Sequence, residues 1–418
     1  MGLKNGLFDR SVGAGKVIGR LSHGYVNSQV NNIFGRAYPE RDAVVKGIVN
    51  ELGEYKGLLL KIGQVASYMD FSLSERTCSI LADLQDRVKP LHFKDINKVV
   101  NSEFGAATDD LFFDFEEKPF AAASVGQVHR AITKLGDEVA VKVQYPKIGK
   151  AIKNDLATVR FAQTVLKPFI KGIGLNEVVD EARYLLMNEC DYCFEADQQT
   201  KLRRIFMTDP EVEIPKVYRH LSGSKVMTSE YFSGQRFGEF KHSASQASKD
   251  HAGQVIAKVL LKSSLKHGIF NGDPHPGNYL FGEDKVCFLD FGHVKVWGSD
   301  ELEKLKMLWK ASFDRDQIKW RRAFLELHRT IKSSLYDESY FYHLYVDGLL
   351  KPYIEPDFKF TRNFILKYSQ SVLKAPLTSF AVPDPAIIVW MRQIFGLNAV
   401  LGQLEAKGSF RAIAEKWI

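Results

Sequence analysis

Three polar residues at fixed intervals constrain this chain more than any other feature of its sequence. In the segment Phe270-Asn-Gly-Asp-Pro-His-Pro-Gly-Asn278, Asp273 precedes Asn278 by five residues, and Asp290 follows twelve residues later in Leu289-Asp-Phe-Gly292. Two prolines stiffen the loop that separates Asp273 from Asn278. The amide oxygen of Asn278 and the carboxylate of Asp290 are the kind of ligand that Mg²⁺ prefers. A proline-rich surface turn would explain the loop's composition, but not the metal-binding group that follows it.

A single lysine on an apolar strand completes this set. Lys142 ends the run Val139-Ala-Val-Lys142, and a lysine so placed can reach the α- and β-phosphates of a nucleotide. Alone, a strand lysine is usually a surface residue, and only its downstream partners favour a functional role. Asp273 and Asn278 have the spacing of the kinase catalytic loop, in which the aspartate is the base or orients the nucleophile. The sequence therefore predicts a phosphotransferase that uses ATP (or ADP) and Mg²⁺, with Lys142 and Asp273 as catalytic residues and Asn278 and Asp290 as metal ligands.

The strand lysine also needs a helical glutamate to hold it in place. A predicted helix from Leu175 to Phe206 offers four acidic candidates, which are Glu189, Asp191, Glu195 and Asp197. We choose Glu195 as the partner of Lys142. Any one of these carboxylates could instead belong to a solvated helix face.

The segment Met227-Thr-Ser-Glu-Tyr231 is predicted to form the hinge beside the adenine ring. Its backbone groups would contact the adenine edge, and Met227 or Thr228 would line the pocket. We include Glu230 among the nucleotide-binding residues.

The hydrophobic pattern predicts an α+β, bilobal, protein-kinase-like fold with an N-terminal helical extension and a helical C-lobe. Apolar residues at three- and four-residue spacing from Glu40 to Asp70 indicate a long amphipathic helix. Short β-like runs then predict an antiparallel sheet entered through a loop. These runs are Leu111–Phe115, Gln127–Ile132, Glu138–Val143 and, further on, Val212–Tyr218 and Lys225–Tyr231.

Helices and one hairpin are predicted for the remainder of the chain. Helical patterning covers Lys147–Ile170 and His251–His267, a hairpin turns at Gly282-Glu-Asp-Lys285, and everything after Ser299 is helical. We divide the chain into a basic N-terminal arm (1–39), a helical extension (40–105), an N-lobe with extended helices (106–233) and a helical C-lobe with the catalytic loop (234–418).

Taken together, these segments resemble the UbiB/AarF-type atypical kinase family, whose members are implicated in ubiquinone and other isoprenoid-quinone metabolism. Three further motifs support this resemblance: Lys61-Ile-Gly-Gln64 matches the family's K-x-G-Q, Ala121-Ala-Ala-Ser-Val-Gly-Gln-Val128 its alanine-rich loop, and Glu189-Cys-Asp191 its E-x-D. Taken alone, Lys61 and Gln64 would be polar-face residues of an amphipathic helix.

The resemblance implies roles for these motifs. The helix carrying Lys61 and Gln64 would pack over the active site, and Lys61 would meet Glu189 or Asp191 where a protein substrate would otherwise dock. The alanine-rich loop would replace the usual glycine-rich phosphate loop, with Ala121, Ala122, Ala123 and Ser124 at the nucleotide. Alanines restrict positive φ, so we expect a different nucleotide pose.

The acceptor is expected to be small or lipid-like rather than a protein. Few residues separate Gly292 from Asp300, which with Glu303 resembles the start of a helix, and no A-P-E segment follows. We therefore predict a Mg-ATP-dependent kinase or ATPase that supports ubiquinone or related isoprenoid-lipid metabolism. The alternative is a nucleotide-gated lipid-binding scaffold with incidental catalysis. A small-molecule kinase of the aminoglycoside or choline type would leave Lys61-Ile-Gly-Gln64 unexplained.

Composition limits the partners and the compartment. A net charge of +7 is mild for 418 residues and does not require nucleic acid. Four scattered cysteines favour a reducing compartment, and Cys190-x-x-Cys193 lacks the second pair that a zinc site needs. No apolar run approaches the roughly 20 residues of a membrane span, and the run Ala386–Met391 suits a packed helix.

We expect a cytoplasmic or organellar-matrix protein without a transmembrane helix, compatible with peripheral attachment to a membrane. The basic N-terminal arm could contact an anionic membrane surface, act as a targeting peptide, or simply be a surface helix. The expected partners are an isoprenoid or quinone-precursor lipid and proteins of quinone biosynthesis.

Overall fold

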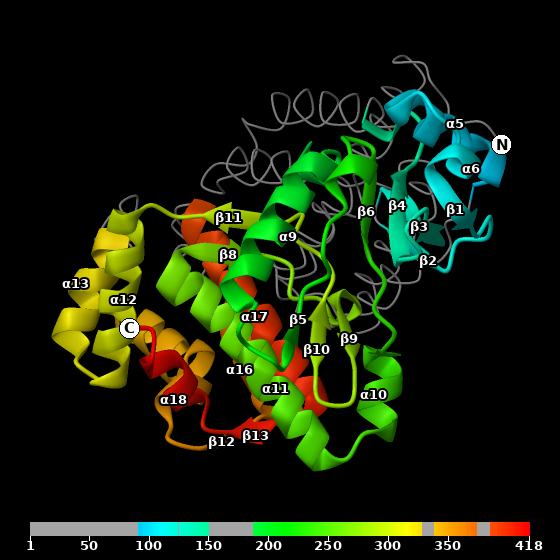
Figure 1. Ribbon diagram of the computed structural model, residues 1–418. Coiled ribbons are helices and arrows are strands. Elements are labelled where there is room, and N and C mark those ends of the chain that lie inside the picture. The colour runs from blue at the N-terminus through cyan, green and yellow to red at the C-terminus, as the bar shows by residue number, and fades with distance from the viewer. Residues whose placement is uncertain (1–90, 124, 150–186, 328–337, 374–384) are drawn as a thin grey trace, which may run out of the picture.

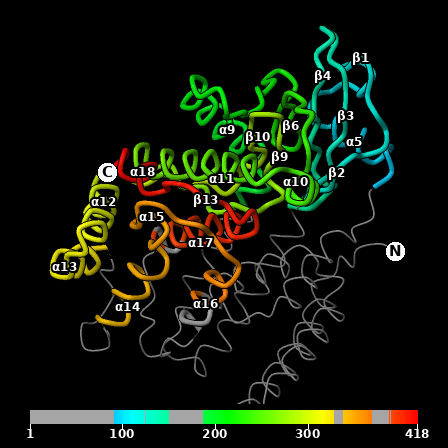
Figure 2. The backbone as a smooth tube through the Cα atoms, turned by 90° about the horizontal axis from the view of Figure 1, so that it is seen from below, coloured from blue at the N-terminus to red at the C-terminus, as the bar shows by residue number. Residues whose placement is uncertain are grey.

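The computed structural model describes residues 91–123, 125–149, 187–327, 338–373 and 385–418 (Figure 1). Several predictions therefore lie outside the described residues: the basic arm, the long helix from Glu40 to Asp70 with Lys61 and Gln64, Ser124, and nearly all of the helix predicted from Lys147 to Ile170. Figures 1 and 2 place a small sheet at one end of the molecule and helices α12 and α13 at the opposite end.

The small sheet has five antiparallel strands in the order β1-β3-β4-β6, and β2 pairs with residues 126–128 of β3 on the same edge as β1, which pairs with residues 131–133. Its strands and the two helices before it are α5 (Phe93–Phe104), α6 (Thr108–Leu111), β1 (Phe112–Phe115), β2 (Ala121–Ala123), β3 (Gly126–Thr133), β4 (Glu138–Gln144) and β6 (Val226–Glu230). Side chains alternate across a strand, so Val139, Val141 and Val143 are fully buried together on one face, packed with α5. Lys142 lies on the other face. The predicted strands in this region are confirmed.

The sequence analysis expected the alanine-rich segment to be a loop, but the structure shows a strand there. Ala121–Ala123 forms strand β2, which pairs with β3 through Ala121 opposite Val128 and Ala123 opposite Gly126. A Cβ on Gly126 would lie 2.3 Å from the carbonyl oxygen of Val143 on β4. The close approach of β3 to β4 at this point therefore requires a glycine.

Of the helix predicted from Leu175 to Phe206, residues 175–186 lie outside the described residues, and the remainder is interrupted at residues 190–191. Helix α9 (Tyr192–Phe206) starts afresh there, because Asp191 is extended and its carboxylate accepts the N–H of Cys193 at 3.0 Å. An aspartate at this position satisfies a backbone donor that the first turn leaves unpaired. The helical periodicity of the sequence does not reveal this cap.

Two small sheets surround the segment with Asp273 and Asp290. A four-stranded sheet has the order β5-β10-β9-β7, and β8 pairs with β11. The elements are β5 (Val212–Glu213), η2 (Arg219–Leu221), β7 (Gln235–Arg236), β8 (Ile269–Asn271), η4 (Pro276–Asn278), β9 (Tyr279–Phe281), β10 (Val286–Phe288) and β11 (Val294–Val296). The hairpin predicted to turn at Gly282–Lys285 is confirmed as β9–β10. The strand predicted over Val212–Tyr218 is reduced to two residues.

The rest of the chain is mainly helical, as predicted. Its elements are α10 (Phe237–Ser243), α11 (Gln246–Leu261), the π turn η3 (Lys262–Lys266), α12 (Ser299–Phe313), α13 (Gln317–Leu327), α14 (Glu338–Leu344), the π turn η6 (Tyr345–Leu349), α15 (Lys351–Ile354), β12 (Phe358–Lys359), α16 (Arg362–Leu373), α17 (Pro385–Leu404), β13 (Lys407–Gly408) and α18 (Phe410–Glu415). Helix α12 begins at Ser299, one residue before the predicted Asp300, which lies in its first turn.

Helix α17 lies beside α11 in the core and reaches the loop that contains Asp273 (Figure 2). Ile387, Val389 and Trp390 are almost fully buried, as expected for a packed helix. Among the described residues, none of the helices combines the length and apolar character needed to cross a bilayer.

Candidate functional site

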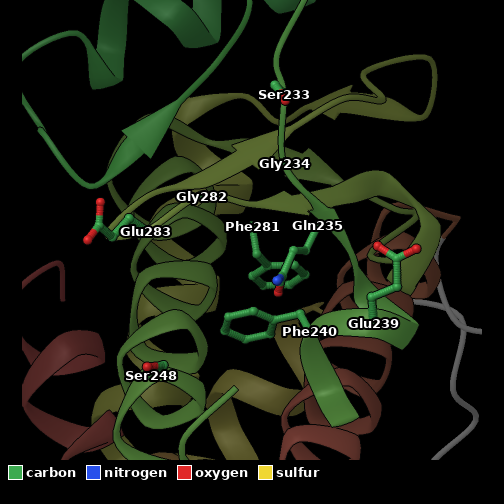
Figure 3. Close-up of a pocket in the computed structure, with 9 residues that line it drawn as sticks. All are labelled: Ser233, Gly234, Gln235, Glu239, Phe240, Ser248, Phe281, Gly282 and Glu283. Atoms are coloured by element: carbon green, nitrogen blue, oxygen red, sulfur yellow. The ribbon is translucent and has the colours of Figure 1, made fainter. Parts of the chain in front are cut away.

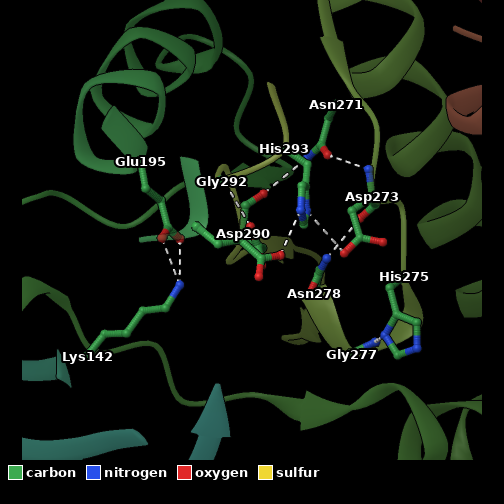
Figure 4. A network of polar contacts seen from close by, with 11 residues as sticks. Lys142, Glu195, Asn271, Asp273, His275, Gly277, Asn278, Asp290, Gly292 and His293 are labelled. Carbon is green, nitrogen blue, oxygen red and sulfur yellow. Dashed lines mark hydrogen bonds and ion pairs between the residues drawn. The ribbon is translucent and has the colours of Figure 1, made fainter. Parts of the chain in front are cut away.

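The first component of the site is an ion pair between the sheet and α9. Nζ of Lys142 on β4 lies 2.9 Å from Oε1 and 2.8 Å from Oε2 of Glu195, so the structure contains the predicted pairing (Figure 4). Glu195 is 3% exposed and Lys142 21%. The ammonium also lies 4.9 Å from the centre of the Tyr192 ring. Lys142 is therefore held in one direction, toward the region of Asp290.

The electrostatics of this pair favour a lysine that stays charged. Burial alone would lower the pKa of Lys142, but the Glu195 carboxylate, with Tyr192 and Asp290, raises that pKa well above its usual value. Burial raises the pKa of Glu195, and the neighbouring Asp290 and Glu189 carboxylates act in the same direction against Lys142. The carboxylates of Glu195, Asp290 and Glu189 thus outnumber the single ammonium group of Lys142 in this region. An additional cation bound here would balance their charge.

The second component is the loop that follows β8. The carboxamide of Asn271 connects two candidate residues, since its Nδ2 donates to the carbonyl oxygen of Asp290 at 3.1 Å and its Oδ1 accepts the N–H of Asp273 at 3.0 Å. Sequence analysis missed Asn271, and the only available signal was its place in Phe270-Asn-Gly-Asp273. It aligns the backbone of the catalytic loop with the segment Asp290–Gly292.

Asn278 has a geometry that suits a metal ligand. Its Nδ2 donates to the carbonyl oxygen of Asp273 at 2.8 Å, which leaves Oδ1 as the end of the carboxamide that could bind a cation. One carboxylate oxygen of Asp290, Oδ1, accepts the N–H of Gly292 at 2.9 Å. Two protein oxygens fit Mg²⁺ in a nucleotide complex, because phosphate and water complete the octahedron. Figure 4 shows Asn278, Asp290 and Asp273 gathered beside Lys142 and Glu195.

No cluster of three or more His, Cys, Asp or Glu side chains that could hold a metal by itself occurs among the described residues. Cys190 and Cys193 are not joined to each other by a disulfide.

The two acidic residues of the E-x-D motif make different contacts. Oε1 of Glu189 lies 2.7 Å from Nε2 of His293, whose Nδ1 lies 3.5 Å from Oδ2 of Asp273. Glu189 is thus part of the catalytic region, whereas Asp191 caps α9. The predicted contact of Lys61 with either residue falls outside the described residues. Sequence analysis also missed His293, although its place directly after Asp290-Phe-Gly292 was an available signal.

The other described residues predicted to bind the nucleotide lie on strands β2 and β6 of the small sheet. Ala121, Ala122 and Ala123 lie on β2, next to the strand opposite Lys142. The hydroxyl of Tyr192 is buried close to Gly126 and has no hydrogen-bond partner in the part of the chain that the structure describes. A buried hydroxyl in this position, at the start of β3, could donate a hydrogen bond to a phosphate oxygen of the nucleotide.

The strand register sorts the hinge residues by face. Met227 is directly opposite Lys142 and so shares its face, whereas Thr228 is opposite Val141 and its hydroxyl donates to the carbonyl oxygen of Leu221. Met227, rather than Thr228, faces the candidate nucleotide site. The Glu230 carboxylate accepts the N–H of Lys216, on the face away from Lys142. A nucleotide contact of Glu230 would therefore involve its backbone.

A cavity of about 470 Å³ lies below the hinge (Figure 3). It is lined by Ser233, Gly234, Gln235, Glu239, Phe240, Ser248, Phe281, Gly282 and Glu283, and the rings of Phe240 and Phe281 stack 4.1 Å apart. None of Lys142, Glu195, Asp273, Asn278 and Asp290 is among its lining residues.

The sheet, the Lys142–Glu195 pair and the loop with Asp273, Asn278 and Asp290 define a protein of the kinase-like class. A model of the ABC1 atypical kinase-like domain matches residues 83–323, more than half of the chain. The chain belongs to this ABC1 atypical kinase-like family, which confirms the resemblance inferred from the sequence motifs.

Similar proteins support this assignment. The mitochondrial atypical kinase COQ8 of Schizosaccharomyces pombe is 30% identical over 316 residues, which cover 73% of this chain and 52% of that protein. The chloroplastic ACTIVITY OF BC1 COMPLEX KINASE 1 of Arabidopsis thaliana is 34% identical over 244 residues, 57% of this chain and 36% of that protein. The chain thus spans about half the length or less of these curated relatives. The solved structure of Rv3197 from Mycobacterium tuberculosis, in complex with erythromycin, matches with a TM-score of 0.68 and 25% identity over 94% of this chain and 98% of that one.

Proposed function

We propose that this chain is a bilobal, Mg-ATP-dependent atypical kinase or ATPase that supports ubiquinone or related isoprenoid-lipid metabolism. The observation that carries the proposal is the buried Lys142–Glu195 pair, held at 2.8 Å beside Asp290. A structural ion pair would not need to lie next to a second set of polar side chains with the kinase interval.

The residues would divide the work as follows. Lys142 binds the nucleotide phosphates, and Glu195 holds its ammonium in place. Asn278 and Asp290 supply oxygen ligands to Mg²⁺, and Asp273 accepts the proton of the attacking hydroxyl or water. When bound, Mg-ATP would supply the phosphoryl group, and its Mg²⁺ would neutralise the charge that develops on the phosphate oxygens. Met227 and the backbone near Glu230 contact the adenine, and Ala121 to Ser124 lie over the phosphates.

A small or lipid-like acceptor fits the chain better than a peptide. After Gly292, β11 pairs at once with β8, and α12 begins at Ser299. A segment of this length has little room for a peptide-binding activation loop. We therefore propose that the acceptor is not a general protein substrate.

The link to quinone metabolism rests on the relatives. Proteins named COQ8 from two yeasts are 30% identical to this chain. The names of the yeast proteins include the word mitochondrial, and the name of the Arabidopsis protein includes the word chloroplastic. We propose an organellar-matrix or cytoplasmic location with peripheral membrane contact, and an isoprenoid or quinone-precursor lipid as partner together with quinone-biosynthesis proteins.

A second candidate function is a nucleotide-gated lipid-binding scaffold. It is favoured by Ala121–Ala123, because a paired alanine strand allows less close approach to phosphates than a glycine-rich loop. In that case nucleotide binding would matter and turnover would be incidental.

ATP hydrolysis by the purified chain with Mg²⁺ tests the proposal, with and without anionic liposomes and a quinone-precursor analogue. Asp290→Asn is expected to abolish turnover. Asp284→Asn, at an exposed position on the β9–β10 turn, is the matched control and should retain it. Turnover that survives in Asp290→Asn would refute the catalytic assignment, and nucleotide binding without Asp290-dependent turnover would support the scaffold.

A further inference from the structure

His293 occupies a fixed place beside the catalytic loop. It follows Asp290-Phe-Gly292 directly and is 2% exposed. Its carbonyl oxygen accepts the N–H of Gly272 at 2.9 Å, and the next residue, Val294, pairs with Asn271 in the β8–β11 ladder. The backbone of His293 is thereby fixed relative to Asp273, which follows Gly272 in the sequence.

The imidazole of His293 lies between two carboxylates that come from distant parts of the chain. Nδ1 is 3.5 Å from Oδ2 of Asp273 (Figure 4), and Nε2 is 2.7 Å from Oε1 of Glu189. Glu189 is 7% exposed, whereas Asp273 is 20% exposed. The ring therefore approaches Asp273 from the protein side, and the carboxylate retains a side that can be reached from outside.

We propose that His293 is the positioning residue of Asp273 and that Glu189 acts on Asp273 through it. This inference rests on the proposed function, since it assigns a role to His293 in the same reaction. The terminal torsion of an aspartate has a broad energy minimum, so an unsupported carboxylate would rotate. A ring fixed by Glu189 limits that rotation and directs one oxygen of Asp273 toward the acceptor. The 3.5 Å separation is long for a hydrogen bond, as is common in catalytic pairs before substrate binds.

The inference gives the E-x-D motif a second purpose. Glu189 precedes the break before α9, so a displacement of this segment would move the carboxylate that holds His293. A ligand or chain segment that binds at the start of α9 and moves Glu189 would then change the orientation of the Asp273 carboxylate. A histidine that merely fills the core would not produce such a dependence.

The test compares His293→Ala, His293→Gln and Glu189→Gln with the natural chain in steady-state ATP turnover. For His293→Ala we expect kcat to fall by roughly 10- to 100-fold, because small misplacements of a reacting group have effects of this size. The KM for ATP should change less than about threefold, because His293 is assigned to Asp273 and not to the nucleotide. His293→Gln, which can still donate a hydrogen bond to one carboxylate, should recover part of kcat.

The double variant Glu189→Gln/His293→Ala distinguishes a shared action from two separate ones. If Glu189 acts through His293, the double variant should be no slower than His293→Ala alone. His129→Ala is the matched control, because His129 is equally buried but lies in the small sheet, away from Asp273. It should lower stability without changing kcat per folded molecule.

Each result decides one of the two hypotheses. An unchanged kcat in His293→Ala, or a loss in the double variant that multiplies the two single losses, would overturn the role of His293. A natural chain without Asp290-dependent turnover would instead overturn the proposed function. Nucleotide-induced thermal stabilisation of each variant shows that it is folded, and His293→Gln keeps the test decisive if the alanine variant does not fold.

Discussion

Gly396 on α17 touches Pro274 of the catalytic loop so closely that a Cβ on Gly396 would lie 2.4 Å from Cγ of the proline. Gly272 has a similar relationship with Val389, at 3.2 Å from its Cγ1. Pro274 adjoins Asp273, so a helix more than one hundred residues further along the chain supports the position of the candidate base. Helix α17 and the catalytic loop form one packed unit.

Gly396→Ala should therefore reduce both stability and turnover. The proline ring cannot move aside as the tip of a flexible side chain could, and overpacking of this kind costs about 1–3 kcal/mol. Denaturant unfolding and ATP turnover measure the two effects. Gly238→Ala in α10 is the control, since its Cβ would meet nothing within 4 Å and should be neutral or slightly stabilising. Equal behaviour of the two variants would show that α17 does not restrain the loop.

Asn271→Ala should lower kcat although Asn271 is not assigned to substrate. Its loss removes the hydrogen bonds to Asp290 O and Asp273 N, and each backbone group left unpaired costs about 1–3 kcal/mol. Asn97→Ala is the comparison, because Oδ1 of Asn97 accepts the N–H of Thr108 at 3.1 Å far from the site. We expect both variants to be less stable and only Asn271→Ala to turn over slowly per folded molecule. A normal kcat in Asn271→Ala would remove its proposed alignment role.

Variants of the Lys142–Glu195 pair should affect folding stability and ATP turnover differently. Lys142→Met leaves a carboxylate that is 3% exposed without its cation, and breaking a buried pair in this way costs about 3 kcal/mol or more. Adding Glu195→Gln removes that carboxylate, so the double variant should regain stability but not turnover. Arg130 and Glu138 form an exposed pair between β3 and β4, and Arg130→Met should change little. A double variant as unstable as Lys142→Met would contradict the argument.

The parts of the site that the sequence predicts are those with fixed intervals. Asp273, Asn278 and Asp290 were found from spacing, and Lys142 from the end of an apolar strand. Their distances in the chain reflect one loop, one hairpin and one strand, all of which are local structures. Choosing Glu195 also needed the expectation that a helix passes the strand, and the structure brings the two together at 2.8 Å.

Asn271 and His293 were not predictable in this way. Their contacts depend on the pairing of β8 with β11, two strands of three residues that lack a distinctive period. The sequence predicts a continuous helix through Asp191, because the cap at Asp191 departs from helical periodicity over only two residues. Likewise, the resemblance to the family's alanine-rich loop predicts a loop at Ala121–Ala123, whereas pairing with β3 makes this segment a strand although alanine has little strand propensity.

His129 should make the folded chain sensitive to mild acid. The ring is fully buried in the small sheet, with Nδ1 2.8 Å from the carbonyl oxygen of Glu116 and Nε2 2.9 Å from Nε2 of Gln127. A neutral imidazole with its proton on Nδ1 donates to Glu116 and accepts from Gln127. The protonated ring would have two donors facing each other at Gln127, whose Oε1 already accepts the N–H of Leu91 at 2.9 Å. Burial accordingly lowers the pKa of His129 below its usual value, with the Glu116 carbonyl acting against that effect.

The sign of the pH effect follows from this lowered pKa. Below pH 6.5 the unfolded chain binds a proton at His129 that the folded chain does not, so folding stability is present above that pH and is lost as pH falls. Chemical denaturation of the natural chain at pH 7, 6 and 5 should show this loss, and His129→Gln should start less stable but decline less. His267, whose pKa burial also lowers, would keep a smaller slope in the variant. An undiminished slope in His129→Gln would mean that other groups cause the acid sensitivity and that the sheet tolerates a charged ring beside Gln127.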